Sequence, residues 1–323
     1  MGRGKAQHNL DLIAKAYEIL EEIHPCSVRA VCYQLFIRRL IPSMKKNHTN
    51  RVSKQLTDAR EARMIPWAWI VDETREAERV PCWSDPHGFA QAAQRSYRRD
   101  NWDQQPTRVE VWSEKGTVRG TLQPVLHRFG VTFRVMHGNT SATVVRNVVE
   151  EYLSHQKPFL ALYVGDHDPS GMCMSEKDLP ARLLRYWVDL GMERDVSFTG
   201  MEHGVMVGPR VRRIALTMED CEAMQATDST LSFSAHEKKK DPNYRWYLGA
   251  YGDRCWELDA MDPNILRARV EQAIRKEIHW RPWRRCLKAE AAEQDSLKLV
   301  MKNWAVGKVF TDSPQNTGLD NPS

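Results

Sequence analysis

FLALYVGDHDPSG, residues 159–171, joins six consecutive apolar residues to a glycine and two aspartates. A continuous apolar run is typical of a central strand that is buried on both faces of a parallel sheet. In open parallel sheets, ligands bind in the loops beyond the carboxyl ends of the strands. The stretch therefore predicts a central strand over 159–166 with two functional carboxylates, Asp166 and Asp168, at its carboxyl end.

Strands and helices alternate on both sides of this run. We expect strands over 108–112, 131–138 and 211–217, and helices over 117–129, 142–155 and 175–190, with Gly130 ending the first helix. This alternation predicts an α/β domain whose parallel sheet is covered by helices on both faces.

The N-terminal part has a different pattern. Apolar residues at helical spacing predict a helix over 9–23, and Ser27 stands as the N-cap of a second helix over 28–39. We expect a third, basic helix over 48–62, followed by a strand or ribbon in MIPWAWIVDETR, residues 64–75. Three helices and a β-ribbon within about 70 residues indicate a winged helix-turn-helix.

We expect three regions along the chain. They are a winged-helix domain over 1–100, an α/β domain with a helical C-terminal extension over 101–311, and a disordered polar tail over 312–323. Residues 225–245 have the composition of a surface loop, and residues 262–300 are expected to be helical.

The composition is that of an ordinary globular protein, with 41% hydrophobic and 28% charged residues. A net charge of +5 permits nucleic-acid binding without requiring it. The seven cysteines form no C-x-x-C pair, which disfavours a disulfide framework or a zinc ribbon. We see neither a signal peptide nor a long apolar run, and expect a cytoplasmic protein.

A third carboxylate, Glu114, follows the strand expected over 108–112. Three carboxylates at neighbouring strand ends would repel one another unless a cation neutralised them, and oxygen ligands favour a hard cation such as Mg²⁺. The two aspartates alone are also common as helix or turn caps, so the pairing with Glu114 carries the metal hypothesis. His167, between them, should point away and be structural.

The segments SEKGTV (113–118) and YVGDHDPSG (163–171) resemble the Toprim domain of the topoisomerase VI A subunit. In that version a lysine follows the glutamate, and the second motif has the form D-x-D-P-x-G. The resemblance covers residues 108–190 well and the remainder loosely. It implies that Glu114, Asp166 and Asp168 are magnesium ligands and that Pro169 and Gly171 shape their loop.

The second helix contains Arg29 and Tyr33, four residues apart and off the stripe that we expect to be buried. On these residues alone, a half-buried tyrosine and a surface arginine are the simpler interpretation. However, VRAVCY (28–33) resembles the motif in which the topoisomerase VI A subunit and the meiotic double-strand-break proteins carry their nucleophilic tyrosine. The resemblance implies that Tyr33 attacks DNA with help from Arg29. Many relatives have an aromatic residue where this chain has Cys32, which we interpret as a packing change.

The resemblance implies a type IIB topoisomerase-like enzyme, with a covalent link between Tyr33 and a DNA 5′ end. It also implies a homodimer in which the tyrosine of one protomer works with the metal site of the other. The sequence holds no nucleotide-binding motif, so strand passage would need a separate ATPase B-type subunit. The alternative is a small stand-alone form.

Two other functions remain open at this point. One is a Toprim nuclease that uses metal-activated water, with Tyr33 structural. The other is a non-catalytic DNA-binding module, which would leave the acidic residues unexplained. Basic segments with aromatic residues, EKKKDPNYRWY (237–247) and HWRPWRRCLK (279–288), suit nucleic-acid contact or a solvated surface, as does Tyr97 among its arginines. WELDAM (256–261) resembles a late family motif but is too short to carry function by itself.

Overall fold

The computed structural model describes residues 2–71, 80–136, 142–155, 157–193, 201–202, 205–206 and 208–305. The expected tail lies outside these residues, as do residues 72–75 of the expected ribbon. The chain divides into two compact units, of which the first comprises Met1–Arg75 and Pro106–Ile278. The second comprises Glu76–Gln105 and His279–Ser323, so the expected division at residue 100 falls inside it.

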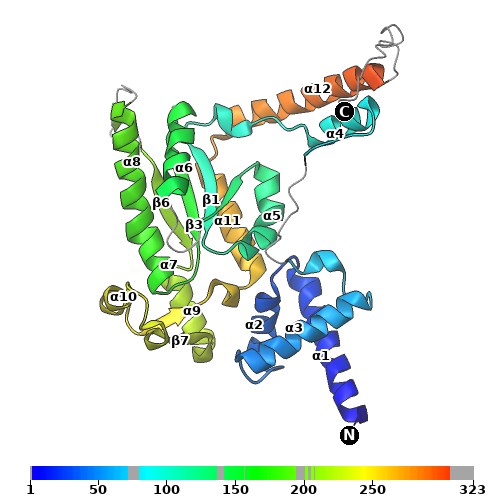
Figure 1. Ribbon diagram of the computed structural model, residues 1–323, viewed down its shortest axis with the longest axis vertical. Coiled ribbons are helices and arrows are strands. Elements are labelled where there is room, and N and C mark those ends of the chain that lie inside the picture. The colour runs from blue at the N-terminus through cyan, green and yellow to red at the C-terminus, as the bar shows by residue number, and fades with distance from the viewer. Residues whose placement is uncertain are drawn as a thin grey trace, which may run out of the picture. The chain divides into compact units, whose positions relative to one another are not determined.

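A four-stranded parallel sheet forms the centre of the first unit, in the order β2-β1-β3-β6 (Figure 1). Its strands are β1 (Arg108–Ser113), β2 (Thr132–Val135), β3 (Phe159–Val164) and β6 (Arg210–Ala215). Every residue of β3 is buried, as the apolar run predicts. Because β1 pairs directly with β3, with Ser113 opposite Val164, the two strands end side by side.

Helices cover both faces of this sheet. Trp112, Ala161 and Tyr163 face one side and pack there with α6 (Ala142–His155) and α8 (Leu179–Glu193). On the other side lie α5 (Thr117–Phe129) and α11 (Pro263–Glu277) (Figure 1). α5 ends at Gly130, which adopts the left-handed conformation that glycine tolerates best. The α/β prediction with a covered parallel sheet is confirmed.

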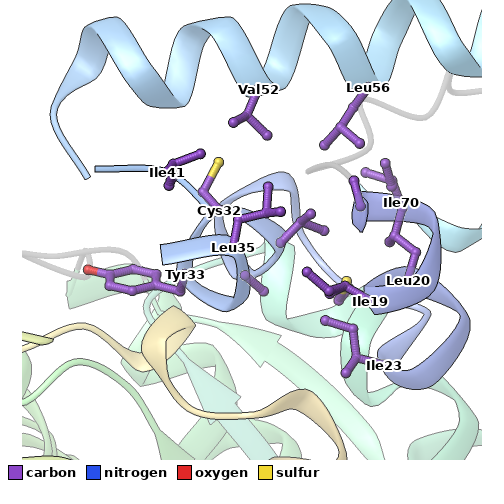
Figure 2. Close-up of a cluster of buried hydrophobic side chains, with 14 of the residues drawn as sticks. Ile19, Leu20, Ile23, Cys32, Tyr33, Leu35, Ile41, Val52, Leu56 and Ile70 are labelled. Carbon is purple, nitrogen blue, oxygen red and sulfur yellow. The ribbon is translucent and has the colours of Figure 1, made fainter. Parts of the chain in front are cut away.

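The N-terminal part of this unit consists of α1 (Gly2–Ile23), α2 (Val28–Ile37) and α3 (Lys46–Glu61). Their apolar faces, with Leu20, Leu35 and Leu56 among the residues, form a common core (Figure 2). Ser27 caps α2 as predicted, since its hydroxyl accepts a hydrogen bond from the backbone N–H of Ala30 at 3.0 Å.

The ribbon expected after α3 is not formed over residues 64–71, the part of it that the structure describes. This segment contains a short 3-10 turn, η1 (Trp67–Trp69), and a single bridge between Ile70 and Cys26. Pro66 precedes the turn and cannot donate a ladder hydrogen bond, while Ile65 and Ile70 are buried in the helical core. The three helices are present, whereas the wing remains a prediction.

The prediction of a loop over 225–245 is wrong, because helices, 3-10 turns and a strand form most of this segment. Buried side chains explain the difference, since Ala235 and Tyr244 of this segment are buried together with Met172, Tyr247 and Cys255. The elements here are α9 (Met218–Thr227), η4 (Ser229–Leu231), β7 (Ser232–Ser234), η5 (Ala235–Lys238), α10 (Tyr244–Tyr251), β8 (Arg254–Trp256) and η6 (Leu258–Ala260). The remaining elements of this unit are α7 (Pro169–Cys173), the π-helical turn η3 (Met174–Asp178), β4 (Met201–Glu202) and β5 (Val205–Met206).

The second unit pairs α4 (Pro86–Ser96) and η2 (Asn101–Gln104) with the long helix α12 (Trp280–Ala305). The Tyr97 hydroxyl donates to Glu293 at 2.7 Å, and Trp102 packs edge-on against Trp283. These contacts explain why residues 76–105 group with the C-terminal helix. None of the helices in the described part of the chain combines the length and the apolar character needed to cross a membrane.

Candidate functional site

The three predicted carboxylates line one cavity of about 750 Å³ in the first unit. Glu114 follows β1, and Asp166 and Asp168 follow the adjacent strand β3. The structure therefore brings these side chains to one edge of the sheet, as the parallel arrangement predicts. Basic side chains share the cavity, namely Arg29, Lys115 and Lys238.

The loop after β3 has a tightly determined backbone. Asp168 caps α7 by accepting a hydrogen bond from the Gly171 N–H at 2.8 Å, and Pro169 occupies the first turn of that helix. A Cβ atom at Gly171 would come within 2.5 Å of the Asp166 carbonyl oxygen, so no larger residue fits there without a backbone shift. Pro169 and Gly171 thus have the loop-shaping role that the resemblance implies.

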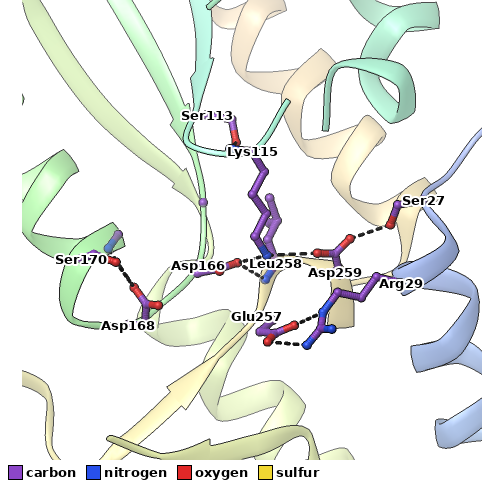
Figure 3. A network of polar contacts seen from close by, with 12 residues as sticks. Ser27, Arg29, Ser113, Lys115, Asp166, Asp168, Ser170, Glu257, Leu258 and Asp259 are labelled. Atoms are coloured by element: carbon purple, nitrogen blue, oxygen red, sulfur yellow. Dashed lines mark hydrogen bonds and ion pairs between the residues drawn. The ribbon is translucent and has the colours of Figure 1, made fainter. Parts of the chain in front are cut away.

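Two lysines neutralise the aspartates, and Figure 3 shows one of them, Lys115, beside Asp166 and Asp259. Lys115 Nζ lies 2.8 Å from Asp166 and 3.0 Å from Asp259, and Lys238 Nζ lies 3.0 Å from Asp168. Burial alone would lower the pKa of Lys238, but Asp168 and Asp166 raise it above the ordinary lysine value. Burial would likewise lower the pKa of Lys115, but Asp166 and Asp259 raise it, so both ammonium groups are charged partners of the acidic site.

Glu114 is half-buried on the same cavity. Burial, and then the charges of Asp168 and Asp166, raise the pKa of its carboxyl. The part of this rise in pKa that comes from the two aspartates reflects converging negative charge, which a bound cation would relieve. Within the described residues, no three His, Cys, Asp or Glu side chains are already arranged around one point to hold a metal. The carboxylate donors nevertheless fit a hard cation, which would replace the ammonium group of Lys238 at Asp168.

Arg213 holds the loop after β3, which carries Asp166 and Asp168, by hydrogen bonds to its backbone. The sequence did not predict this role. The Arg213 side chain is 6% exposed, and Nη1 donates to the carbonyl oxygens of Gly165 and Asp166 at 3.1 and 3.2 Å. Nη2 donates to the Gly171 carbonyl at 2.6 Å. One buried guanidinium thus joins both ends of the loop that carries the aspartates. β6 contains three arginines, Arg210, Arg212 and Arg213, so the sequence alone did not single out Arg213.

His167 is structural, in keeping with the expectation from sequence. It is fully buried, and its Nδ1 forms a hydrogen bond of 2.8 Å with the Tyr247 hydroxyl. Burial, with a smaller contribution from the charge of Arg213, lowers the pKa of the imidazole to about 4. The ring is neutral at physiological pH and belongs to the packing beneath the site.

Tyr33 is more buried than we expected, with an exposed fraction of 5%. The reason is that all residues from Ala30 to Phe36 are buried, since the helical core covers one side of α2 and η6 packs against another. Figure 2 shows the phenol at the margin of the core, with its hydroxyl pointing away from the other labelled side chains. The ring of Tyr33 is thus part of the hydrophobic core, whereas its hydroxyl points out of the core.

The hydroxyl of Tyr33 donates to Glu257 Oε2 at 3.2 Å. Arg29 holds the same carboxylate with two donors, Nε to Oε2 and Nη2 to Oε1. The Arg29 guanidinium also lies 5.7 Å from the centre of the Tyr33 ring, as expected for two residues one turn apart. Burial, and then the charge of Glu257, raise the pKa of Tyr33. The charge of Arg29 lowers this pKa and offsets only part of the rise.

Glu257 and Asp259 connect the tyrosine helix to the acidic site (Figure 3). Between them, the Leu258 N–H donates to Asp166 Oδ1 at 2.8 Å. Asp259 accepts a hydrogen bond from the Ser27 hydroxyl at 2.7 Å and forms an ion pair with Lys115. The motif WELDAM therefore supplies the central part of the network. Its signal was two carboxylates flanking an apolar residue.

In comparisons with family models, curated proteins and solved structures, none was found to match this chain.

Proposed function

We propose that this protein is a DNA-cleaving enzyme of the topoisomerase VI A type, in which Tyr33 becomes linked to a DNA 5′ end. The observation that carries the proposal is the cavity at the ends of β1 and β3. Three carboxylates and Arg29 line it, and Glu257 on its wall binds the Tyr33 hydroxyl. Carboxylates, guanidinium and phenol are the groups needed for transesterification of a phosphodiester.

In the proposed reaction, the Tyr33 oxygen forms a bond to phosphorus while the bond from phosphorus to the DNA 3′ oxygen breaks. The proton of the phenol is released, and the 3′ oxygen leaves as a hydroxyl after taking up a proton. One phosphodiester replaces another, so the step is reversible. Arg29 stabilises the charge on the phosphate, since a guanidinium has five N–H donors and the fork to Glu257 uses two.

Magnesium would be held by Glu114, Asp166 and Asp168. When bound there, it supplies positive charge that orients a phosphodiester and stabilises its oxygens. The chain itself keeps these carboxylates at one edge of the sheet. The pairing of β1 with β3 places the strand ends together, and the hydrogen bonds of Arg213 fix the loop after β3.

Duplex DNA is the proposed substrate, and a homodimer is the proposed assembly, with one tyrosine for each strand. The two lysines and the arginine that line the cavity suit contacts to the DNA backbone. Strand passage would require a separate ATPase subunit, whereas a stand-alone form would nick, relax or join DNA.

The test is cleavage of supercoiled plasmid with Mg²⁺, stopped by denaturant and analysed with and without protease. Wild-type protein should give cut DNA that carries protein until the protease removes it. Tyr97→Phe is a matched control, because it also removes a phenol that donates to a glutamate, but in the second unit. Its product should equal that of wild type, whereas Tyr33→Phe should give none.

A second candidate, a metal-dependent nuclease that uses water, is favoured by the burial of Tyr33. The carboxylates line the cavity, while the phenol reaches it through Glu257. This function predicts cut DNA that is free of protein, and full cleavage by Tyr33→Phe.

A further inference from the structure

Attack by Tyr33 raises the question of where its proton goes. Burial and the neighbouring charge of Glu257 raise the pKa of this phenol. The phenol therefore keeps its proton until the moment of attack, and the site must contain an acceptor. A general base has to lie within hydrogen-bond reach of the proton that it removes, about 2.6–3.2 Å between heavy atoms.

We propose that Glu257 is the general base that takes the proton from Tyr33 during DNA cleavage and returns it on resealing. Its Oε2 accepts the Tyr33 hydroxyl at 3.2 Å, at the long end of the range expected before a substrate tightens the site. The proposal deepens the function given above and rests on it.

Arg29 is the group that orients this base. Its Nε and Nη2 bind both carboxylate oxygens of Glu257, a fork that fixes the plane of the carboxylate. A nucleophile, a base and a third group that orients the base form the arrangement by which enzymes activate weak nucleophiles. Tyr33, Glu257 and Arg29 match it in this order.

The backbone next to Glu257 ties the base to the acidic site. The Leu258 N–H donates to Asp166, and Asp259 shares Lys115 with Asp166. The position of Glu257 is thereby set by the same carboxylate that is proposed to hold the metal. Base, nucleophile and phosphate site are therefore positioned by one continuous set of contacts.

The proton balance of the step is complete without a further reactant. In cleavage, the Tyr33 proton passes to the Glu257 carboxylate as the oxygen–phosphorus bond forms, and the leaving 3′ oxygen takes a proton from water. Glu257 then releases its proton to solvent. In resealing, the 3′ hydroxyl loses a proton to solvent, and Glu257 takes up a proton from solvent and delivers it to the departing Tyr33 oxygen.

The experiment measures the first-order rate at which a nicked duplex oligonucleotide becomes covalently attached to full-length protein under single-turnover conditions. Glu257→Gln keeps the size of the side chain and removes its basicity. We expect its rate to fall by about 100-fold or more, the usual contribution of a general base, with DNA affinity within about twofold of wild type. Glu22→Gln is the matched control, because it also removes a carboxylate that pairs with an arginine. That arginine, Arg38, lies at the C-terminal end of α2 and does not line the cavity.

Rescue of the alanine variant separates a base from a structural role. Formate added to Glu257→Ala should restore attachment in proportion to its concentration, because a small carboxylate can occupy the vacated space and accept the proton. Should these variants fail to fold, Glu257→Asp carries the test. It keeps the charge that pairs with Arg29, yet withdraws the carboxylate from the phenol, and its rate should fall at least tenfold.

Three results would overturn the inference while leaving the proposed function standing. The first is attachment by Glu257→Gln at the wild-type rate. The second is attachment by Glu257→Gln faster than wild type, which would mean that Glu257 competes with the phosphate. The third is attachment by Glu257→Asp at the wild-type rate. By contrast, if wild-type protein forms no covalent product at all, the proposed function itself fails.

Discussion

Two carboxylates of the cavity, Glu257 and Asp168, are held by cations of different kinds. Glu257 is gripped by the planar fork of Arg29 through two donors, whereas Asp168 meets the single ammonium of Lys238 at 3.0 Å. A guanidinium fork fixes orientation, while an ammonium acts as a point charge on a flexible stem. From this difference we expect the Glu257 carboxylate to keep a fixed orientation, and we propose that Asp168 is the carboxylate that exchanges its cation for a metal ion.

Removing charge on the aspartate side should have the largest effect. We predict that Asp166→Asn or Asp168→Asn slows covalent attachment by about 100- to 1,000-fold, the range seen when one stabilising group of a transition state is lost. Asparagine retains the oxygen that accepts from Leu258 in one case and from Gly171 in the other, so folding should persist. Rates from quenched time courses test this.

Asp228→Asn provides the control for these variants. Asp228 also caps a turn, at Thr230, and also pairs with a cation, Arg39, but it does not line the cavity. Its rate should match that of wild type. Equal losses in all three variants would mean that the aspartates act through stability alone.

The next prediction concerns whether both sides of the cavity act within one chain. The family resemblance implies a site shared between protomers, with the tyrosine and the acidic residues of one chain too far apart to cooperate. In the structure, Arg29 lines the same cavity as Glu114, Asp166 and Asp168 of its own chain. We therefore predict that mixing Tyr33→Phe with Asp166→Asn protein restores no attachment. Nicked plasmid from the mixture would instead establish the shared site.

A smaller effect is expected from the exchangeable cation. Lys238→Met removes the ammonium that a divalent ion must displace from Asp168. Because the lysine side chain is 42% exposed and its ion pair is screened, the gain should be modest, a half-saturating Mg²⁺ concentration lower by about two- to fivefold. Lys239→Met, the exposed neighbour, is the control. A requirement for more Mg²⁺ in Lys238→Met would contradict an exchangeable aspartate side.

The smallest predicted effect is on stability. Tyr33→Phe removes one hydroxyl that donates to Glu257, while Arg29 continues to hold that carboxylate. The free energy of unfolding should fall by about 0.5–1.5 kcal/mol, the net contribution of one hydrogen bond. Urea unfolding measures it. A loss several times larger would show that the phenol is part of the framework of the fold.

The acidic side of the cavity was predictable because its signals are local. An apolar run marks a buried strand, and a parallel sheet places neighbouring strand ends together. Glu114 directly follows one such end, and Asp166 and Asp168 lie in the loop after the other. Ser27 and Gly130 mark helix ends by backbone chemistry that is likewise local.

The tyrosine side was not predictable in the same way, because its contacts join distant parts of the chain. Tyr33 and Glu257 are 224 positions apart, and no periodicity relates them. The burial of Tyr33 follows from the packing of η6 against α2, which helical spacing alone does not reveal. The pairing of residues 76–105 with α12 is another long-range result.

The most direct test of the account is to identify the residue that carries DNA. Wild-type protein is trapped on a short duplex, digested with trypsin and nuclease, and analysed by mass spectrometry. Cleavage after Arg29 and Arg38 yields a peptide over 30–38 with Tyr33 as its one tyrosine. We predict that this peptide carries a nucleotide through its tyrosine, linked at the 5′ phosphate. Cut DNA together with an unmodified peptide, or a nucleotide on another residue, would contradict the account.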